Sequence, residues 1–292
     1  MIDSRTQMVG VISWPVEHSL SPVMHNAAFE ALEMNWRYVP FPVVPGAAAD
    51  AARGLIPLGF RGANVTVPHK RDVADGADRL SAEAAAIGAI NTLCVEGSRG
   101  SDRTVVGYNT DLAGFLDGLK RAGFDPTGER AVIVGAGGVA RAAVYGLLHA
   151  GASGVTVFAR TRGKAERLAF DLDDGSGRLV AERLTGEAIV EVAAHSALMV
   201  NTTPVGMWPE TEQSIWPDEA AFPEHAIAYD LVYIPRRTKF LRQAEAAGAP
   251  CIEGLRMFVV QGAKSFELWT GCEPSIDVMT RACEKALGGD GA

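Results

Sequence analysis

The sequence predicts an α/β fold with two domains, the second of which is built on a parallel sheet. Short apolar runs alternate with helix-like runs along the chain, as expected for strands joined by helical crossovers. The chain has 292 residues, enough for about two domains of ordinary size. A glycine-rich turn at 135–140 stands between an apolar strand and a helix, which is the arrangement of a βαβ unit.

The first part of the chain predicts alternating strands and helices and then a hairpin. Ser21 and Pro22 predict a helix start, because serine is a favoured N-cap and proline fits the first helical position. Ser81 is a second predicted cap. The polar stretch 96–103 contains glycine and predicts the turn of a hairpin. The expected strands are 8–12, 36–43, 62–67, 91–95 and 104–107, and the expected helices are 22–32, 81–86 and 110–123.

The remaining chain predicts the second domain and then a helical segment. We expect the last two helices to pack back on the first domain, which gives a substrate domain of 1–112 with 250–292 and a central domain of 113–249. The elements on which this rests are strands 131–134, 155–158, 198–200 and 226–232, a helix that ends at His149, and helices 255–269 and 277–287.

The charge balance restricts the kind of partner. The chain carries 27 basic and 35 acidic residues and a net charge of −8, which argues against nucleic-acid binding because that requires a basic surface. No window approaches 18 uninterrupted apolar residues, and the start lacks a basic segment followed by an apolar stretch. We therefore expect neither a membrane span nor a signal peptide. A small anionic substrate is compatible with this balance, because a local cluster of donors can bind it.

The cysteines predict a reduced, cytoplasmic protein without a structural metal. Cys94, Cys251, Cys272 and Cys283 form no C-x-x-C pair, and the histidine spacing completes no zinc pattern. Free thiols are the ordinary state of cysteine in the cytoplasm. The sequence leaves open whether the protein is a monomer or a homodimer.

The glycine turn predicts a dinucleotide site. Gly135 permits a tight turn, Gly137 lets a pyrophosphate approach the backbone, and Ala140 allows close packing of helix on sheet. The amides at the helix start then face an anion. The alternative is a glycine-rich helix entry that binds no ligand.

The end of the next strand favours NADP over NAD. An acidic side chain there would accept hydrogen bonds from the ribose 2′-hydroxyl and repel a 2′-phosphate. The chain instead carries three cations and a hydroxyl, namely Arg160, Thr161, Arg162 and Lys164. Such side chains suit a phosphate. The alternative is a solvated basic helix start, although cations are unfavourable there because the helix dipole attracts anions.

Lys70 and Asp111 are the predicted catalytic pair. Reduction of a ketone by hydride leaves an alkoxide that must take up a proton, and the reverse reaction must remove one. A partly desolvated lysine can serve both directions and stabilise the oxyanion, and a neighbouring carboxylate can orient it. The alternative is an ordinary surface salt bridge, and the sequence does not decide which of the two carries the proton.

Ser19 and Ser21 form a candidate carboxylate site. They stand two residues apart just before a predicted helix, so that both hydroxyls and the helix amides can meet one anion. The alternative is that Ser21 only caps the helix and Ser19 belongs to a loop.

These motifs, taken together and in this order, resemble the shikimate dehydrogenase family from Gly10 to Gly271. The resemblance implies a substrate domain and a Rossmann-like NADP-binding domain. It also implies NADPH-dependent, reversible reduction of 3-dehydroshikimate to shikimate on the route to chorismate and the aromatic amino acids. The segments that carry it are Ser19-Leu20-Ser21-Pro22, 64–70, 107–111, the glycine turn, 160–164, 201–207 and Asp230-Leu231-Val232-Tyr233.

The resemblance also assigns residues to the two ligands. The substrate residues that it implies are Ser19, Ser21, Thr66, Lys70, Asn91, Asp111, Tyr233 and Gln261. The cofactor residues that it implies are Gly135, Ala136, Gly137, Gly138, Val139, Arg160, Thr161, Lys164, Thr203, Leu231, Gly254 and Met257. Tyr233 and Gln261 could instead satisfy hydrogen bonds in the core, and Met257 could be a core methionine.

Two departures and two rival functions remain. Ala159 replaces an asparagine of the family, and Ala82 stands where many members carry an acidic residue. A quinate/shikimate or aminoshikimate dehydrogenase paralogue, perhaps with NAD, is the nearest rival, because the substrates differ by a small ring substituent. A non-catalytic NADP-binding sensor is the other rival, and the presence of both Lys70 and Asp111 argues against it.

Overall fold

The structure is a computed structural model that describes residues 2–97 and 102–289. The chain divides into two compact units. Unit 1 contains Met1–Thr110 and Val259–Ala292, and unit 2 contains Asp111–Phe258. These divisions fall at 110/111 and 258/259, whereas the sequence suggested 112/113 and 249/250, because one helix, α9 (Gly254–Thr270), contributes residues to both units.

Unit 1 is built on a mixed six-stranded sheet with the order β2-β1-β3-β5-β6-β4. Strands β1, β2 and β3 are parallel, whereas β5 is antiparallel to both β3 and β6, and β4 is parallel to β6. The pair β5–β6 is the predicted hairpin, and the centre of its turn lies outside the described residues. The strands are β1 (Gln7–Ser13), β2 (Trp36–Pro42), β3 (Gly62–Val65), β4 (Arg79–Leu80), β5 (Thr92–Glu96) and β6 (Thr104–Tyr108).

The helices of unit 1 show where the cap predictions hold and where they fail. Ser81 is an N-cap as predicted, since its hydroxyl accepts a bond from the amide of Ala84. Ser21 is not a cap, because it is already the first helical residue and Leu20 precedes it without a side-chain bond. The helices are α1 (Ser21–Ala31), α2 (Ala48–Gly54), η1 (Asp72–Gly76), α3 (Ala82–Ile87) and α10 (Ile276–Gly289), and α10 packs on α1 as expected.

Unit 2 is built on a six-stranded sheet in which every strand pair is parallel. Its order is β12-β11-β10-β7-β8-β9. Counted from β7, this is the order 3-2-1-4-5-6 of dinucleotide-binding sheets, whose ligands bind beyond the carboxyl ends of the strands where the winding reverses. The strands are β7 (Arg130–Val134), β8 (Gly154–Ala159), β9 (Leu179–Arg183), β10 (Leu198–Asn201), β11 (Ile227–Asp230) and β12 (Cys251–Ile252).

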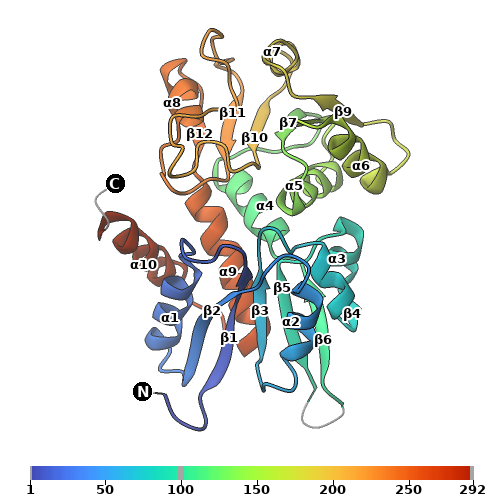
Figure 1. The fold of residues 1–292 in the computed structure, drawn as a ribbon. Coiled ribbons are helices and arrows are strands. Elements are labelled where there is room, and N and C mark those ends of the chain that lie inside the picture. The colour runs from blue at the N-terminus through green and yellow to red at the C-terminus, as the bar shows by residue number, and fades with distance from the viewer. Residues whose placement is uncertain (1, 98–101, 290–292) are drawn as a thin grey trace. The chain divides into compact units, whose positions relative to one another are not determined.

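Helices cover both faces of this sheet, and each face has its own apolar core. One core joins side chains of α4, α5 and α6 to the strands, and the other joins side chains of α7 and α8 to the opposite face. Figure 1 shows the two helix groups on either side of the strands. The helices are α4 (Asp111–Arg121), α5 (Gly138–His149), α6 (Arg162–Leu172), α7 (Gly186–Ala193) and α8 (Lys239–Ala246). Among the described residues, no helix has the length and apolar character that a membrane span requires.

Gly118 of α4 makes the packing of Tyr229 possible. A Cβ at Gly118 would lie 2.3 Å from the Tyr229 hydroxyl oxygen and 2.8 Å from the adjacent ring carbon. Tyr229 is fully buried and stacks on Phe115, with ring centroids 5.4 Å apart. We expect Gly118→Ala to lower the free energy of unfolding by about 1–3 kcal/mol, because overpacking a dense core displaces side chains or backbone. Urea unfolding of the purified protein measures this loss.

Gly163 in the first turn of α6 is the matched control. No atom lies within 4 Å of the position of its Cβ. Gly163→Ala should therefore leave the free energy of unfolding unchanged or raise it by up to about 1 kcal/mol, through helix propensity alone. Equal losses for the two alanine variants would contradict the packing argument for Gly118.

Candidate active site

Lys70 lies in the turn that follows β3. Thr66 comes directly after this strand, and its amide donates to the carbonyl of Ile12 over 3.0 Å. The carbonyl of Lys70 accepts from the amide of Ile90 at 2.7 Å, and the lysine is only 9% exposed. The turn is thus anchored on both sides, and it holds the buried Lys70 near the carboxyl end of the parallel strands.

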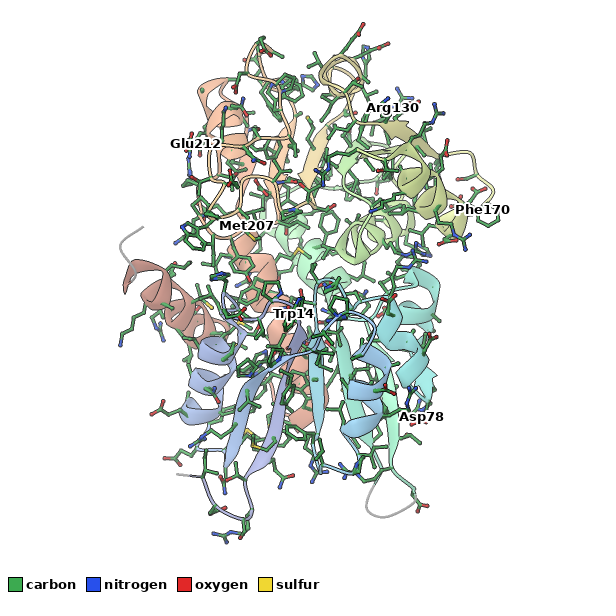
Figure 2. The ribbon with its side chains drawn as sticks, viewed as in Figure 1. Trp14, Asp78, Arg130, Phe170, Met207 and Glu212 are labelled. Carbon is green, nitrogen blue, oxygen red and sulfur yellow. The ribbon has the colours of Figure 1, made fainter. Side chains whose placement is uncertain are left out.

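His69 belongs to the packing of this turn. Its ring is fully buried, and Nε2 lies 2.7 Å from the carbonyl oxygen of Val43. His69 therefore connects the turn to the segment that follows β2. Trp14, labelled in Figure 2, follows β1, and its amide donates to the carbonyl of Val67 in the Lys70 turn.

Asn91 and Gln261 are brought together in unit 1. The Asn91 amide nitrogen donates to Thr110 Oγ1 at 2.8 Å and to Gln261 Oε1 at 3.2 Å. Its oxygen accepts from the amide of Thr110 at 2.7 Å. Gln261 therefore acts as an acceptor toward Asn91. The expectation that these two residues share a site agrees with this geometry.

Ser19 and Ser21 also lie close together at the start of α1. Ser19 Oγ accepts from the amide of Ser21 at 3.3 Å, and Ser21 is buried. Leu20, the residue before α1, makes no side-chain cap, and the Ser19 hydroxyl is the partner of the first amide of the helix. This arrangement suits an anionic group.

Asp111 is the first residue of α4 and is 4% exposed. A carboxylate at a helix start is stabilised by the unpaired amides and the dipole of the first turn. Asp111 is counted in unit 2 and Lys70 in unit 1, but Thr110, the residue before Asp111, is bonded to Asn91 of unit 1.

The glycine turn of unit 2 has the features of a pyrophosphate cradle. Gly135 has φ 124°, and a Cβ there would lie 2.2 Å from Thr202 Oγ1, so only glycine fits. At Gly137, by contrast, a Cβ would meet no atom within 4 Å. No side chain caps α5, which begins at Gly138. Ala136 and Val139 line the same half-buried turn, and Ala140 is buried against the sheet. The turn therefore fits the pyrophosphate of a dinucleotide.

The basic segment after β8 is exposed and begins α6. Thr161 is the residue before the helix, and its hydroxyl makes no capping bond. Arg162 is paired with Glu166, 2.9 Å away. Among the described residues, Arg160 and Lys164 have no ion pair, and no acidic side chain occupies the first turn of α6. A 2′-phosphate is the charge that this segment fits.

A buried network joins the two loops that follow β10 and β11. Asn201 Nδ2 donates to Asp230 Oδ1 at 2.9 Å, and Asn201 Oδ1 accepts from the hydroxyl of Thr203 at 2.7 Å. Asp230 also accepts from the amide of Val232 at 3.0 Å and from the hydroxyl of Thr238 at 2.6 Å. The loop that holds Thr203 continues to the exposed Met207, labelled in Figure 2.

The remaining predicted cofactor residues lie around the start of α9. Leu231 and Gly254 touch, since a Cβ at Gly254 would lie 2.7 Å from the Leu231 carbonyl. Met257 is buried in the core of unit 2, which agrees with the alternative of a core methionine. Tyr233, half-buried in the same unit, stacks on Phe258 with ring centroids 4.4 Å apart.

Asp230 gives the stability a specific pH dependence. Burial raises the pKa of Asp230 to about 6 from 3.8, and its three hydrogen bonds oppose this only in part. Between about pH 4 and pH 6, the Asp230 carboxyl is ionised in the unfolded chain but keeps its proton in the folded protein. Raising the pH through this range therefore lowers the contribution of Asp230 to the free energy of unfolding. The difference in free energy of unfolding between Asp230→Asn and wild type should therefore change by about 3 kcal/mol in favour of the variant from pH 4 to pH 6. This value follows from a shift of about two pKa units at about 1.4 kcal/mol per unit. Urea titrations of both proteins at pH 4, 5, 6 and 7 measure it, and parallel curves would contradict it.

Sequence reasoning missed three polar residues behind the site. Asn64 is a buried amide within the otherwise apolar β3, and Ser265 lies one helical turn after Gln261 on the buried face of α9. Thr92 opens β5 next to Asn91. The available signal was a polar residue inside an apolar strand, since buried amides require hydrogen-bond partners. In the described part of the chain, no group of three or more His, Cys, Asp or Glu side chains could hold a metal ion.

Comparison with known proteins places these features in a family. The family profile "Shikimate dehydrogenase substrate binding domain" matches residues 11–93, and "Shikimate 5'-dehydrogenase C-terminal domain" matches residues 254–284. The shikimate dehydrogenase (NADP(+)) of Moorella thermoacetica is 45% identical over 288 residues, which cover 98% of this chain and 96% of the relative. The chain belongs to the shikimate dehydrogenase family. The predicted family and fold class are thereby confirmed.

Solved structures agree with this membership. Shikimate 5-dehydrogenase from Thermus thermophilus, in complex with NADP(H) and shikimate, is 37% identical with a TM-score of 0.83, covering 96% of this chain and 100% of that chain. Quinate dehydrogenase from Corynebacterium glutamicum, in complex with NAD, is 28% identical with a TM-score of 0.85, covering 96% and 99%. The family therefore includes members with a different substrate and cofactor in their names.

Proposed function

We propose that this chain is an NADP-dependent shikimate dehydrogenase that interconverts 3-dehydroshikimate and shikimate on the route to chorismate and the aromatic amino acids. The observation that carries this is a 45% identity to such an enzyme over nearly the full length of both chains. The exposed, acid-free basic segment after β8 supports the choice of NADP over NAD. The buried Lys70 and Asp111 support catalysis over binding alone.

The cofactor residues divide into two groups by charge. The turn from Gly135 to Val139 and the start of α5 receive the pyrophosphate, and Arg160, Thr161 and Lys164 receive the 2′-phosphate. Thr203, Leu231 and Gly254 would hold the nicotinamide end, and Met257 belongs to the core of unit 2. These residues would hold a cofactor that supplies the hydride chemistry, with NADP⁺ as the acceptor and NADPH as the donor.

The substrate residues divide by the group that they meet. Ser19, Ser21 and the start of α1 receive the ring carboxylate, because hydroxyls and a helix N-terminus suit an anion. Thr66, Asn91, Tyr233 and Gln261 bind the ring hydroxyls, and the Asn91–Gln261 bond holds two of these side chains together.

Lys70 and Asp111 perform the proton transfer. During oxidation the reacting hydroxyl gives up its proton to this pair, and during reduction the pair returns a proton to the alkoxide. The Lys70 side chain is buried, and its charge would stabilise the developing oxyanion more strongly there than in water. Asp111 orients the ammonium and bonds the same hydroxyl.

Initial rates test this proposal. Purified protein is mixed at alkaline pH with shikimate or quinate and with NADP or NAD, and the absorbance of reduced cofactor is followed. We expect shikimate with NADP to give the highest kcat/KM, and 3-dehydroshikimate to consume NADPH in the reverse direction. A preference for quinate or NAD would indicate an activity like that of the quinate dehydrogenase described above. No turnover with any combination of substrate and cofactor would indicate a binding protein.

A further inference from the structure

Four buried polar side chains form a connected group in unit 1. Asn64, Thr92, Thr110 and Ser265, here called the polar hub, are each 6% exposed or less, and Thr92 and Ser265 are fully buried. Asn64 and Thr92 are cross-strand partners of β3 and β5. Thr110 precedes α4, and Ser265 lies on α9. Four separate segments of the chain therefore meet in this hub.

Ser265 is the common partner of the other three hub residues. Its hydroxyl accepts from the amide of Asn64 at 2.8 Å, and it lies 2.7 Å from the Thr92 hydroxyl and 3.2 Å from the Thr110 hydroxyl. It also donates to the carbonyl of Gln261, one turn earlier, at 3.0 Å. Ser265 thus ties its own helix to β3, to β5 and to the segment before α4.

Each hub residue is next to a proposed substrate residue. Thr66 follows Asn64 by two positions at the end of β3, and Asn91 immediately precedes Thr92. Asp111 immediately follows Thr110. Gln261 lies one turn before Ser265 and accepts from Asn91. The hub is therefore linked to these four substrate residues, either by a hydrogen bond or by a neighbouring position in the chain.

A purely structural role would be met as well by apolar side chains. Burying a polar group costs free energy unless it is hydrogen-bonded, and even a satisfied network contributes only modestly to stability. A satisfied network does, however, fix the relative positions of the segments that it joins, because its bonds are directional. We therefore expect the hub to fix the relative positions of these segments more than to raise the free energy of unfolding.

We propose that Ser265 is a positioning residue for the substrate: it holds α9 in the register that presents the Gln261 amide beside Asn91. This inference rests on the proposed function. Without the Ser265 hydroxyl, α9 loses its bonds to Asn64, Thr92 and Thr110. The hub keeps its Asn64–Thr92 and Thr92–Thr110 bonds, but the placement of Gln261 and Asn91 relative to each other loses the support of Ser265. Ordering them again on binding then costs part of the substrate affinity.

The variant Ser265→Ala tests this role. We expect KM for shikimate to rise about tenfold, as for a lost hydrogen bond at a binding site. KM for NADP should stay within about twofold, because the hub belongs to unit 1 and the proposed cofactor residues to unit 2. A lower melting temperature with both KM values unchanged would overturn the proposal, and so would an equal rise of both.

Thr92 and Thr270 provide matched controls. Thr92→Val removes the hub hydroxyl with little change in shape, whereas Thr92→Ser keeps it, so only the first should raise KM for shikimate. Thr270 lies on α9 too, and its hydroxyl also bonds the carbonyl four residues earlier, that of Phe266, at 2.8 Å. Thr270→Val should leave both KM values unchanged. Equal KM values for Thr92→Val and Thr92→Ser would contradict a role for the hub.

A double-mutant cycle shows whether Ser265 acts through Gln261. In a Gln261→Ala protein, Ser265→Ala should add less than about twofold to KM for shikimate, because the residue that it positions is already gone. Fully multiplicative effects would overturn the proposed route. The activity of the wild type distinguishes failure of the proposed function from failure of this inference. An inactive wild type refutes the proposed function. An active wild type, together with an unchanged KM for shikimate in Ser265→Ala, refutes only this inference.

Discussion

Lys70→Met should lower kcat for shikimate oxidation by about 10²- to 10⁴-fold, the usual contribution of a positioned acid or base. Methionine has a similar length and no proton to give or take, and the site of Lys70 is only 9% exposed, so the fold should tolerate it. KM should change much less than kcat, because the lost interaction is strongest with the developing oxyanion. Steady-state kinetics with saturating NADP measures both constants.

Two further variants are controls for the Lys70→Met experiment. Lys285→Met removes an exposed lysine of α10 in the same unit and should leave kcat unchanged. Lys70→Ala should regain part of its kcat when a small primary amine is added, because the amine can supply the missing proton acceptor. A Lys70→Met protein that retains more than about a tenth of the wild-type kcat would contradict the assignment.

Arg160→Ala should raise KM for NADP by about 10- to 100-fold, which is the loss of one hydrogen bond to a charged group. KM for NAD should be unaffected, because NAD has no 2′-phosphate for the guanidinium to bind. The variant thus reduces the preference for NADP without changing the reacting end of the cofactor. Initial rates with each cofactor at saturating shikimate measure the change in preference.

Arg167 is the matched control for Arg160. It lies further along α6, where it pairs with Asp171 and its guanidinium lies 5.8 Å from the ring centroid of the exposed Phe170, which is labelled in Figure 2. Arg167→Ala should leave both cofactor KM values unchanged. If Arg160→Ala weakened NADP and NAD equally, the segment after β8 would be acting on a part that the two cofactors share, and the 2′-phosphate assignment would be wrong.

The strongly patterned elements could be predicted from the sequence. The apolar strand, glycine turn and helix from Arg130 to His149 appear as β7, the turn and α5, because each step has its own local signal. The helices that became α9 and α10 were also found, within one or two residues of their bounds. Their apolar residues recur at helical spacing, and this periodicity is the strongest signal in a single sequence.

Other elements carried no such signal. The short helix α2 consists largely of alanine and glycine, and the edge strand β9 has no fully buried residue, so neither shows an apolar period. Ser21 looked like an N-cap, but the helix begins one residue earlier than the prediction. Cap signals locate a helix start only to within a residue or two.

The candidate site shows the same division. The residue types in the turn and in the basic segment indicated their ligands directly, because phosphate sites use local backbone and consecutive side chains. The polar hub could not be predicted, because Asn64 and Ser265 are 201 positions apart and meet only in the folded chain. The Arg162–Glu166 pair, which leaves Arg160 and Lys164 as the cations available to a phosphate, also became visible only in the structure.

Transfer of deuterium tests the central claim most directly. The protein oxidises shikimate that carries deuterium on the carbon bearing the reacting hydroxyl, with NADP as the cofactor. The mass of the reduced cofactor is then measured by mass spectrometry. The account predicts one deuterium in each NADPH formed, and a much slower but equally labelled product with Lys70→Met, because Lys70 belongs to the pair that transfers the proton and takes no part in the hydride transfer. Unlabelled NADPH, or no NADPH from the wild type, would contradict it.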